Sequence, residues 1–191
     1  MENQVTSYLE DSLSVVSSIV ANKGLQSKIE QLALLIVSSL KKGGKIMFIG
    51  NGGSAADSQH MAAEYVSRFA FDRKGLPGIA LTTDTSILTA IGNDYSFDNV
   101  FSRQLNTLGN EGDILIAYST SGRSLNIVKA INEAKSMGIY SVLFTGLEGS
   151  ALSNADLTIA SPSSSKPHIQ EGHLILGHLL CYLVEKLYFK G

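Results

Sequence analysis

Five short apolar runs alternate with helix-like segments between residues 45 and 161, and this alternation restricts the fold more than any other feature of the chain. The runs are KIMFIG, GIALTT, DILIAYS, SVLFTG and DLTIAS. Helix-like segments at 54–69, 85–92, 97–108 and 124–137 separate them, with a short turn near 148–154. Strands buried on both faces read as near-continuous apolar runs. The pattern therefore predicts an α/β fold: a three-layer, doubly wound, five-stranded parallel sheet.

Apolar residues at helical spacing extend this pattern at both ends. Two such segments, 3–22 and 25–42, precede the first strand, and another covers about 168–189. The 191 residues are enough for one well-buried core, and no linker interrupts them. We expect a single domain over 1–191, with N-terminal helices over 1–42, an α/β core over 44–165 and a C-terminal helix over 167–190.

Charge and hydropathy exclude several classes of protein. The net charge is −2 and no basic block is present, so we expect no nucleic-acid partner. No segment has the length of a membrane span and the N-terminus does not read as a signal peptide, so we expect no membrane partner and a cytoplasmic location. Cys181 lies in an apolar helical pattern and is interpreted as a core thiol.

The first strand runs into the glycine loop GNGGSAADS. Gly50, Gly52 and Ala55 fit the G-x-G-x-x-G/A pattern of a dinucleotide site. No acidic residue is well placed for that role, because Asp72 precedes the next strand and Asp84 lies too far along. A P-loop is excluded because no G-K-[ST] follows. A tight turn without any ligand explains these glycines equally well.

A second loop, STSGRS at 119–124, favours a phosphate ligand. It concentrates hydroxyl groups at the start of a predicted helix, where free N–H groups attract anions. An ordinary N-cap needs one hydroxyl, and this loop carries four: Ser119, Thr120, Ser121 and Ser124. The carboxyl ends of parallel strands meet in the crevice that binds ligands in open α/β sheets. The two loops together favour a phosphate monoester over a dinucleotide.

His60 and Glu64 lie four residues apart on the predicted helix that follows the glycine loop. They share one face, about 6 Å apart along the axis, so they can hold one metal ion or form a solvated surface pair. By base rate an isolated pair of this kind is a surface pair. The start of the helix at the ligand crevice argues for a functional role.

The last helix adds further polar candidates: His168, Gln170, Glu171, His173 and His178. Gln170 and His178 are eight residues apart, which is about 80° of rotation and roughly 12 Å of rise. Both can reach one ion only if their side chains converge along the helix. The spacing alone does not select them over His173.

Taken together, these residues resemble the phosphoheptose isomerases of the sugar-isomerase (SIS) domain superfamily over essentially the whole chain. The motifs that carry the resemblance are GNGGSAADSQHMAAEYVSRF (50–69), LTAIGNDYSF (88–97), FSRQ (101–104), GDILIAYSTSGRS (112–124) and IQEGHLILGH (169–178). The resemblance implies the flavodoxin-like SIS fold with extra terminal helices.

The resemblance also implies roles for particular residues. The metal ligands of the family match His60, Glu64, Gln170 and His178, and these residues would hold one Zn²⁺ per subunit. Glu64 and His178 match the catalytic base and acid. The substrate-binding positions match Asn51, Gly52, Gly53, Glu64, Asn93, Asp94, Ser119, Thr120, Ser121, Ser124 and Gln170.

The implied reaction converts D-sedoheptulose 7-phosphate to D-glycero-D-manno-heptose 7-phosphate, an aldose–ketose isomerisation through an enediol(ate). It is the first step toward the ADP- or GDP-heptose precursors of glycans such as lipopolysaccharide. The family is tetrameric, and the terminal helices are apolar on more than one face, so a homotetramer with active sites near subunit boundaries is expected.

Two other functions remain open at this point. A non-catalytic SIS protein, such as the replication-initiator-associating protein, has similar length but lacks the glutamate and the second histidine, which are both present here as Glu64 and His178. A sugar-phosphate-sensing SIS domain of a transcriptional regulator would need a DNA-binding module, for which neither length nor charge leaves room.

Overall fold

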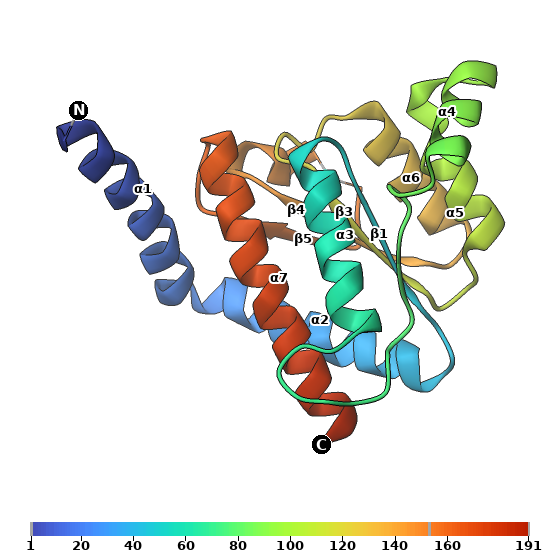
Figure 1. Cartoon of the computed structure of the whole chain (residues 1–191), viewed down its shortest axis with the longest axis horizontal. Coiled ribbons are helices and arrows are strands. Elements are labelled where there is room, and N and C mark those ends of the chain that lie inside the picture. Colours follow the sequence, from blue (N-terminus) through green and yellow to red (C-terminus); the bar gives the residue numbers. More distant parts are fainter. Residues whose placement is uncertain (1, 153, 191) are drawn as a thin grey trace.

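The computed structural model describes residues 2–152 and 154–190 and confirms the predicted α/β fold (Figure 1). Five parallel strands form one sheet in the order β2-β1-β3-β4-β5. They are β1 (Ile46–Gly50), β2 (Gly78–Ala80), β3 (Ile114–Tyr118), β4 (Tyr140–Thr145) and β5 (Leu157–Ala160). Only Gly78–Ala80 of the predicted run GIALTT is a strand, because β2 lies at the sheet edge and pairs with β1 alone.

The described residues form these helices in chain order: α1 (Glu2–Ala21), α2 (Lys23–Lys41), α3 (Gly53–Val66), α4 (Thr85–Asp94), α5 (Ser102–Leu108), α6 (Leu125–Ser136) and α7 (Lys166–Phe189). Short 3₁₀ turns cover Phe97–Asn99 and Leu147–Leu152. The structure differs from expectation at the predicted helix 97–108, which divides because the Ser96 hydroxyl accepts the Asp98 N–H and starts a separate 3₁₀ turn. Position 153 of the predicted turn near 148–154 lies outside the described residues.

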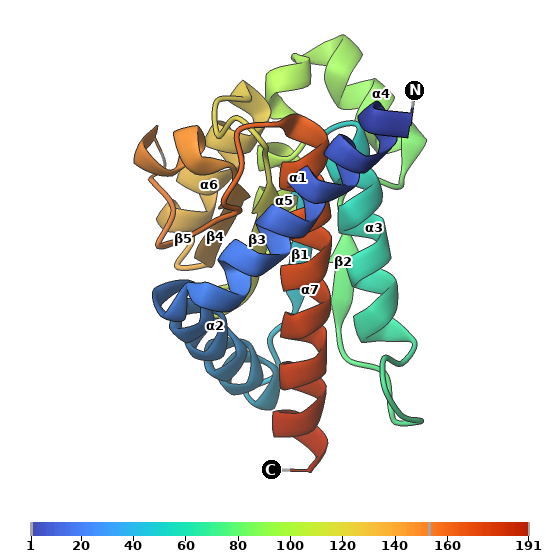
Figure 2. The ribbon, with the colours of Figure 1, turned by 90° about the vertical axis from the view of Figure 1, so that its left-hand side faces the viewer.

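The helices cover the two faces of the sheet unequally. On one face, side chains of α2, α3 and α7 pack with the inward residues of the strands, including Phe48 and Phe144. On the other face, α5 and α6 enclose a second core around Leu115 and Leu143. In Figures 1 and 2, α1 extends away from this body and runs beside the first part of α7.

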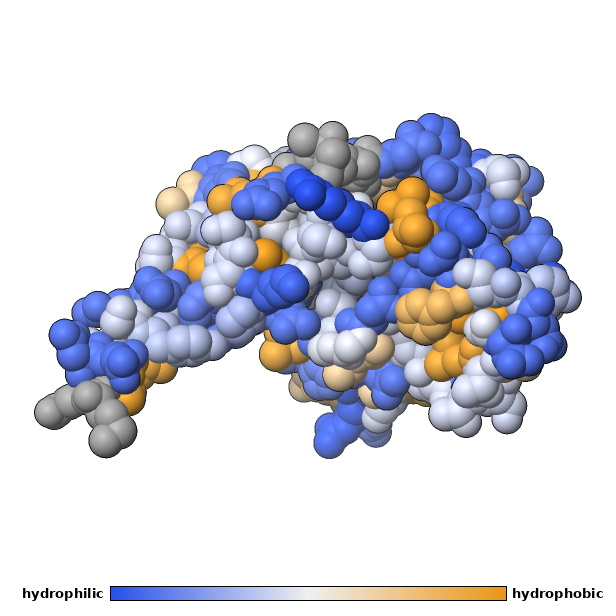
Figure 3. Space-filling model, turned by 90° about the horizontal axis from the view of Figure 1, so that it is seen from above, coloured by the Kyte–Doolittle hydropathy of each residue, from blue (hydrophilic) through white to orange (hydrophobic). Residues whose placement is uncertain are grey.

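Apolar side chains remain on two parts of the surface. On α1, Val5, Leu9 and Leu13 repeat at four-residue spacing and are 62%, 62% and 64% exposed. Seen from above in Figure 3, apolar surface also gathers at the α4–α5 end, where Ile87 and Phe97 are exposed. None of the helices in the described part of the chain is both long enough and apolar enough to cross a membrane.

The strand order places the candidate site. The chain goes from β1 to β2 on one side and then returns to β3 on the other, so the order reverses between β1 and β3. In open α/β sheets, ligands bind at the carboxyl ends of the strands at such a reversal. Gly50 pairs with Tyr118 at these two ends, which sets the loops 51–53 and 119–124 beside each other.

Candidate active site

The glycine loop after β1 is shaped by close backbone packing. Gly52 has φ of +57°, a conformation that favours glycine, and it stands directly before α3. A Cβ atom on Gly50 would collide with the backbone of Ser54 in the first turn of α3. Gly50 and Gly52 therefore let the backbone turn sharply from β1 into α3, which leaves the N-terminus of α3 at the crevice.

The hydroxyl groups of the second loop differ in how far the protein itself uses them. Ser119 is buried, and its Oγ has no hydrogen-bond partner among the described residues. Ser124 is the N-cap residue of α6, but its side chain makes no capping hydrogen bond. The Ser121 hydroxyl accepts a hydrogen bond from the backbone N–H of Arg123 at 3.2 Å. A buried hydroxyl without a partner is costly, so Ser119 indicates a ligand with acceptor atoms at this loop.

A pair of amides joins the glycine loop to the first turn of α6, directly after the second loop. The Nδ2 of Asn51 donates to the Oδ1 of Asn126 at 2.9 Å, and the Nδ2 of Asn126 donates back to the Oδ1 of Asn51 at 2.8 Å. Asn126 is buried in the first turn of α6 and was missed by the sequence interpretation. The only feature of the sequence that could have pointed to Asn126 is that a polar residue occupies the inward face of a predicted helix. The pair fixes the separation of these two segments, and Asn51 is one of the substrate-binding positions that the resemblance implies.

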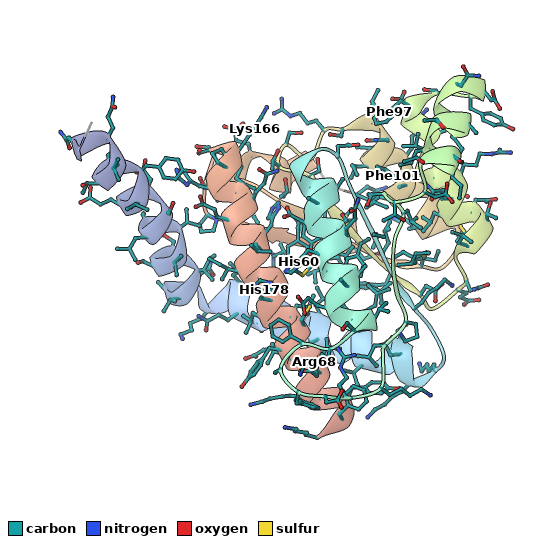
Figure 4. The ribbon with its side chains drawn as sticks, viewed as in Figure 1. His60, Arg68, Phe97, Phe101, Lys166 and His178 are labelled. Carbon is teal, nitrogen blue, oxygen red and sulfur yellow. The ribbon has the colours of Figure 1, made fainter. Side chains whose placement is uncertain are left out.

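His60, Glu64 and His178 come together between α3 and α7 (Figure 4). The Nε2 atoms of the two histidines are 2.8 Å apart, and the Nε2 of His60 lies 3.6 Å from Oε1 of Glu64. One ligand atom from each of the three residues lies within 4.8 Å of the others. Burial lowers the pKa of His178, and the neighbouring His60 lowers it further, while Glu64 opposes the shift.

This group has the chemistry of a metal site. Two imidazole nitrogens and one carboxylate oxygen are a common ligand set for a catalytic ion, which keeps a further position open for substrate. The two Nε2 atoms are 2.8 Å apart, which is a hydrogen-bond distance, so one imidazole donates its N–H and the other accepts it, and both atoms face the same space beside Glu64. These three side chains can therefore hold a metal ion.

The structure does not bring every predicted residue to this cluster. Gln170 lies at the other end of the α3–α7 contact, where its side-chain amide packs against Gly53. Asn93 and Asp94 are exposed in the last turn of α4, and their side chains hydrogen-bond to each other at 2.8 Å. In Figure 1, α4 stands apart from α3 and α7.

The other histidines of α7 have separate partners. Nδ1 of His168 contacts Oε2 of Glu171 at 3.1 Å, in a group that also includes Tyr8 on α1. His173 is fully buried, and its Nε2 contacts the backbone oxygen of Thr145 at 3.1 Å. Burial lowers the pKa of His173 to about 4, so it stays neutral at pH 7. Three-dimensional placement thus distinguishes His178 from His173 where spacing did not.

Comparison with known proteins shows the family of the chain. A family model described as SIS domain matches residues 7–146. A phosphoheptose isomerase of Burkholderia pseudomallei (strain K96243) is 52% identical over 194 positions, covering 99% of this chain and 98% of that protein. One from Aneurinibacillus thermoaerophilus is 49% identical, covering 100% and 97%. The solved structure of phosphoheptose isomerase GmhA from Neisseria gonorrhoeae superposes with a TM-score of 0.89 at 37% identity, covering 97% of this chain and 98% of that one. The chain therefore belongs to the SIS domain family and, within it, to the phosphoheptose isomerases.

Proposed function

We propose that this isomerase converts D-sedoheptulose 7-phosphate to D-glycero-D-manno-heptose 7-phosphate, the first step toward activated heptose. One observation carries the proposal. The α3 helix begins at a loop suited to phosphate and then presents Glu64 beside His60 and His178. The isomerisation of a sugar phosphate requires a site that holds the phosphate group and an acid–base group at a fixed distance from it. The start of α3 and Glu64 supply these two parts on one helix.

The substrate phosphate would bind at the carboxyl ends of β1 and β3. The hydroxyls of Ser119, Thr120, Ser121 and Ser124 and the backbone of Asn51, Gly52 and Gly53 are the groups assigned to it and to the adjoining sugar. The N-terminus of α6 adds favourable partial charge. Because the phosphate does not react, its binding energy serves to place C1 and C2 of the sugar near Glu64.

Glu64 and His178 would move the protons. Glu64 removes a proton from C1 of the open-chain ketose while His178 protonates O2, which gives the enediol. Glu64 then returns a proton to C2 as the O1 proton leaves to His178, and the aldehyde forms at C1. Each proton removed is returned, so no oxidant or reductant is needed. Glu64 and His178 can act as base and acid only while they are not fully engaged as metal ligands, so the proposal includes loose or shifting coordination during turnover.

The proposal includes one Zn²⁺ per subunit. His60, Glu64 and His178 would hold it, since their donor set and mutual distances fit a catalytic site. When bound, zinc supplies a Lewis acid for the sugar carbonyl and the enediolate oxygens. Gln170 is the fourth ligand that the resemblance implies. In this structure its amide contacts Gly53, which suits its other implied role, contact with the substrate.

A homotetramer with active sites near subunit boundaries is also part of the proposal. The exposed stripe of Val5, Leu9 and Leu13 on α1 is an apolar surface of the kind that a second copy covers. Asn93 and Asp94 lie apart from the α3–α7 cluster of their own chain, so we expect them to reach substrate held by a neighbouring subunit. The cytoplasmic location stays a prediction.

The direct test is incubation of the purified protein with sedoheptulose 7-phosphate, with the product read by NMR. We expect conversion to the aldose, loss of activity with a chelator, and recovery when zinc is restored. A protein without turnover under any of these conditions would support a non-catalytic SIS protein instead. The presence of Glu64 and His178 in one cluster favours the enzyme.

A further inference from the structure

The loop that follows α3 holds that helix to α7 through a buried ion pair. In Figure 1 the loop leaves the lower end of α3 and passes next to the C-terminal part of α7. Within it, Nε of Arg73 lies 2.8 Å from Oε1 of Glu185 on α7. The two side chains are only 3% and 1% exposed. Removing one partner of such a buried pair is strongly destabilising, because the other charge is left buried and unpaired. The pair therefore holds the loop firmly to α7.

Arg73 caps the end of the helix that carries Glu64. An α-helix leaves its last four carbonyl groups without intrahelical partners. In α3, Nη2 of Arg73 donates to the carbonyl oxygen of Glu64 at 2.8 Å, and Nη1 donates to that of Tyr65 at 2.7 Å. A glycine in the left-handed conformation commonly ends a helix, but Ser67 follows α3 with φ of −83°. The guanidinium group thus takes the place of a C-terminal glycine cap.

Glu185 on α7 binds the backbone of the loop that follows α3. Its carboxylate accepts the backbone N–H groups of Phe69 at 3.0 Å and Ala70 at 2.7 Å. Burial opposes ionisation of Glu185, but these two donors and Arg73 outweigh it, so the pKa lies below its usual value. The same anchoring places the Phe69 ring 5.7 Å from the ring of His178.

We propose that Arg73 and Glu185 are positioning residues that set Glu64 on α3 against His178 on α7. Glu64 stands in the last turn of its helix, the part that frays first without a cap. His178 lies seven residues before Glu185, about two turns along α7. One ion pair therefore fixes the end of α3 and its distance from α7. The inference rests on the proposed function for its catalytic consequence, while its structural consequence is independent of substrate.

Four variants test the pair. Arg73→Met removes the cap and the charge, and Arg73→Lys keeps the charge but loses the planar fork. Glu185→Gln weakens the anchor, and the double variant R73M/E185L replaces both charges by apolar groups, a change that often preserves stability. Zinc affinity is measured by titration with Zn²⁺ alone, and amide hydrogen exchange is measured over residues 60–70.

Asp113→Asn is the matched control. The Asp113 side chain is 2% exposed, is paired with Lys45, and also accepts two backbone N–H groups, those of Lys45 and Asn110. It therefore resembles Glu185 in burial and bonding, but it lies at the amino ends of β1 and β3, away from the cluster. Any effect shared with this control reflects general loss of stability.

We expect Arg73→Met to weaken zinc binding and lower kcat by about 10-fold or more, as for other residues that orient metal ligands, with a smaller change in KM. Hydrogen exchange should rise over the last turn of α3, and Arg73→Lys should be intermediate. The double variant should fold but keep the defect. Zinc affinity and exchange equal to those of Asp113→Asn, or full recovery in the double variant, would overturn the inference. If the wild type fails to convert sedoheptulose 7-phosphate, the proposed function fails, while the zinc and exchange comparisons still decide the role of the pair.

Discussion

Ser119→Ala should weaken phosphate binding without lowering the free energy of unfolding. A variant that shows both results would identify the Ser119 hydroxyl as a group that binds phosphate. In the free protein the Ser119 hydroxyl is buried and has no partner among the described residues. Removing an unpaired buried hydroxyl leaves stability unchanged or raises it, by up to about 1–3 kcal/mol. With phosphate bound, the same change removes a hydrogen bond to a charged group, which costs about 1.5–3 kcal/mol. At about 1.4 kcal/mol per tenfold, the dissociation constant should rise about 10- to 150-fold.

Ser141→Ala is the matched control. Ser141 is a fully buried serine on β4 whose hydroxyl donates to Oδ2 of Asp156 at 2.8 Å and accepts the Asp156 N–H at 3.2 Å. Its replacement should lower the free energy of unfolding by about 1–3 kcal/mol and leave phosphate binding unchanged. Urea unfolding gives the first quantity for both variants, and titration with inorganic phosphate gives the second. Equal destabilisation of the two variants, with unaltered phosphate affinity in Ser119→Ala, would refute the reasoning.

Further predictions concern the acid–base group, the metal, the buried histidine and the interface. Glu64→Gln should lower kcat by about 10²–10⁴-fold with little change in phosphate affinity, and near-normal turnover would remove Glu64 from the base role. Chelation should abolish turnover until zinc is restored, and full kcat after metal removal, checked by metal analysis, would show that the ion is not needed. The pKa of His173 falls from 6.5 to about 4 on folding, so the unfolded chain takes up the proton first as pH falls. The free energy of unfolding should therefore fall by up to about 3 kcal/mol between pH 7 and pH 4. His173→Gln should reduce this dependence on pH in denaturant titrations, and an unchanged pH dependence in the variant would contradict the prediction. If the chain forms the proposed homotetramer, Leu9→Glu should dissociate it in sedimentation experiments, whereas Glu10→Gln should not. A tetramer in both variants would place the interface elsewhere.

Sequence patterns predicted the sheet well because β1, β3 and β4 are buried along nearly their whole length and read as near-continuous apolar runs. The same apolar repetition located α2, α6 and α7 within a few residues. The end of α3 was predicted three residues late, at 69 and not Val66, because its cap comes from Arg73 and its anchor from Glu185. Neither contact is visible in a local pattern, since Glu185 is 112 residues away from Arg73.

The candidate site was predictable only in part. His60 and Glu64 share one helix, so their spacing alone indicated a common face. His178 needed the family resemblance, because the geometry of α7 against α3 separates it from His173. Asn126 was missed because its role depends on two loops that meet across the sheet.

The placement of His178 on α7 has a consequence for how the protein is made. Every strand is synthesised before α7, yet the metal-type cluster lacks one of its three members until that helix emerges and docks. Until α7 docks, the apolar side chains of α2 and α3 that face it are exposed to solvent. Such exposed apolar surface makes a partly folded chain prone to aggregation. A metal ion held by all three residues could bind only after position 178 has been translated and α7 has docked, and a chain that ended before position 178 would lack one of the three ligands.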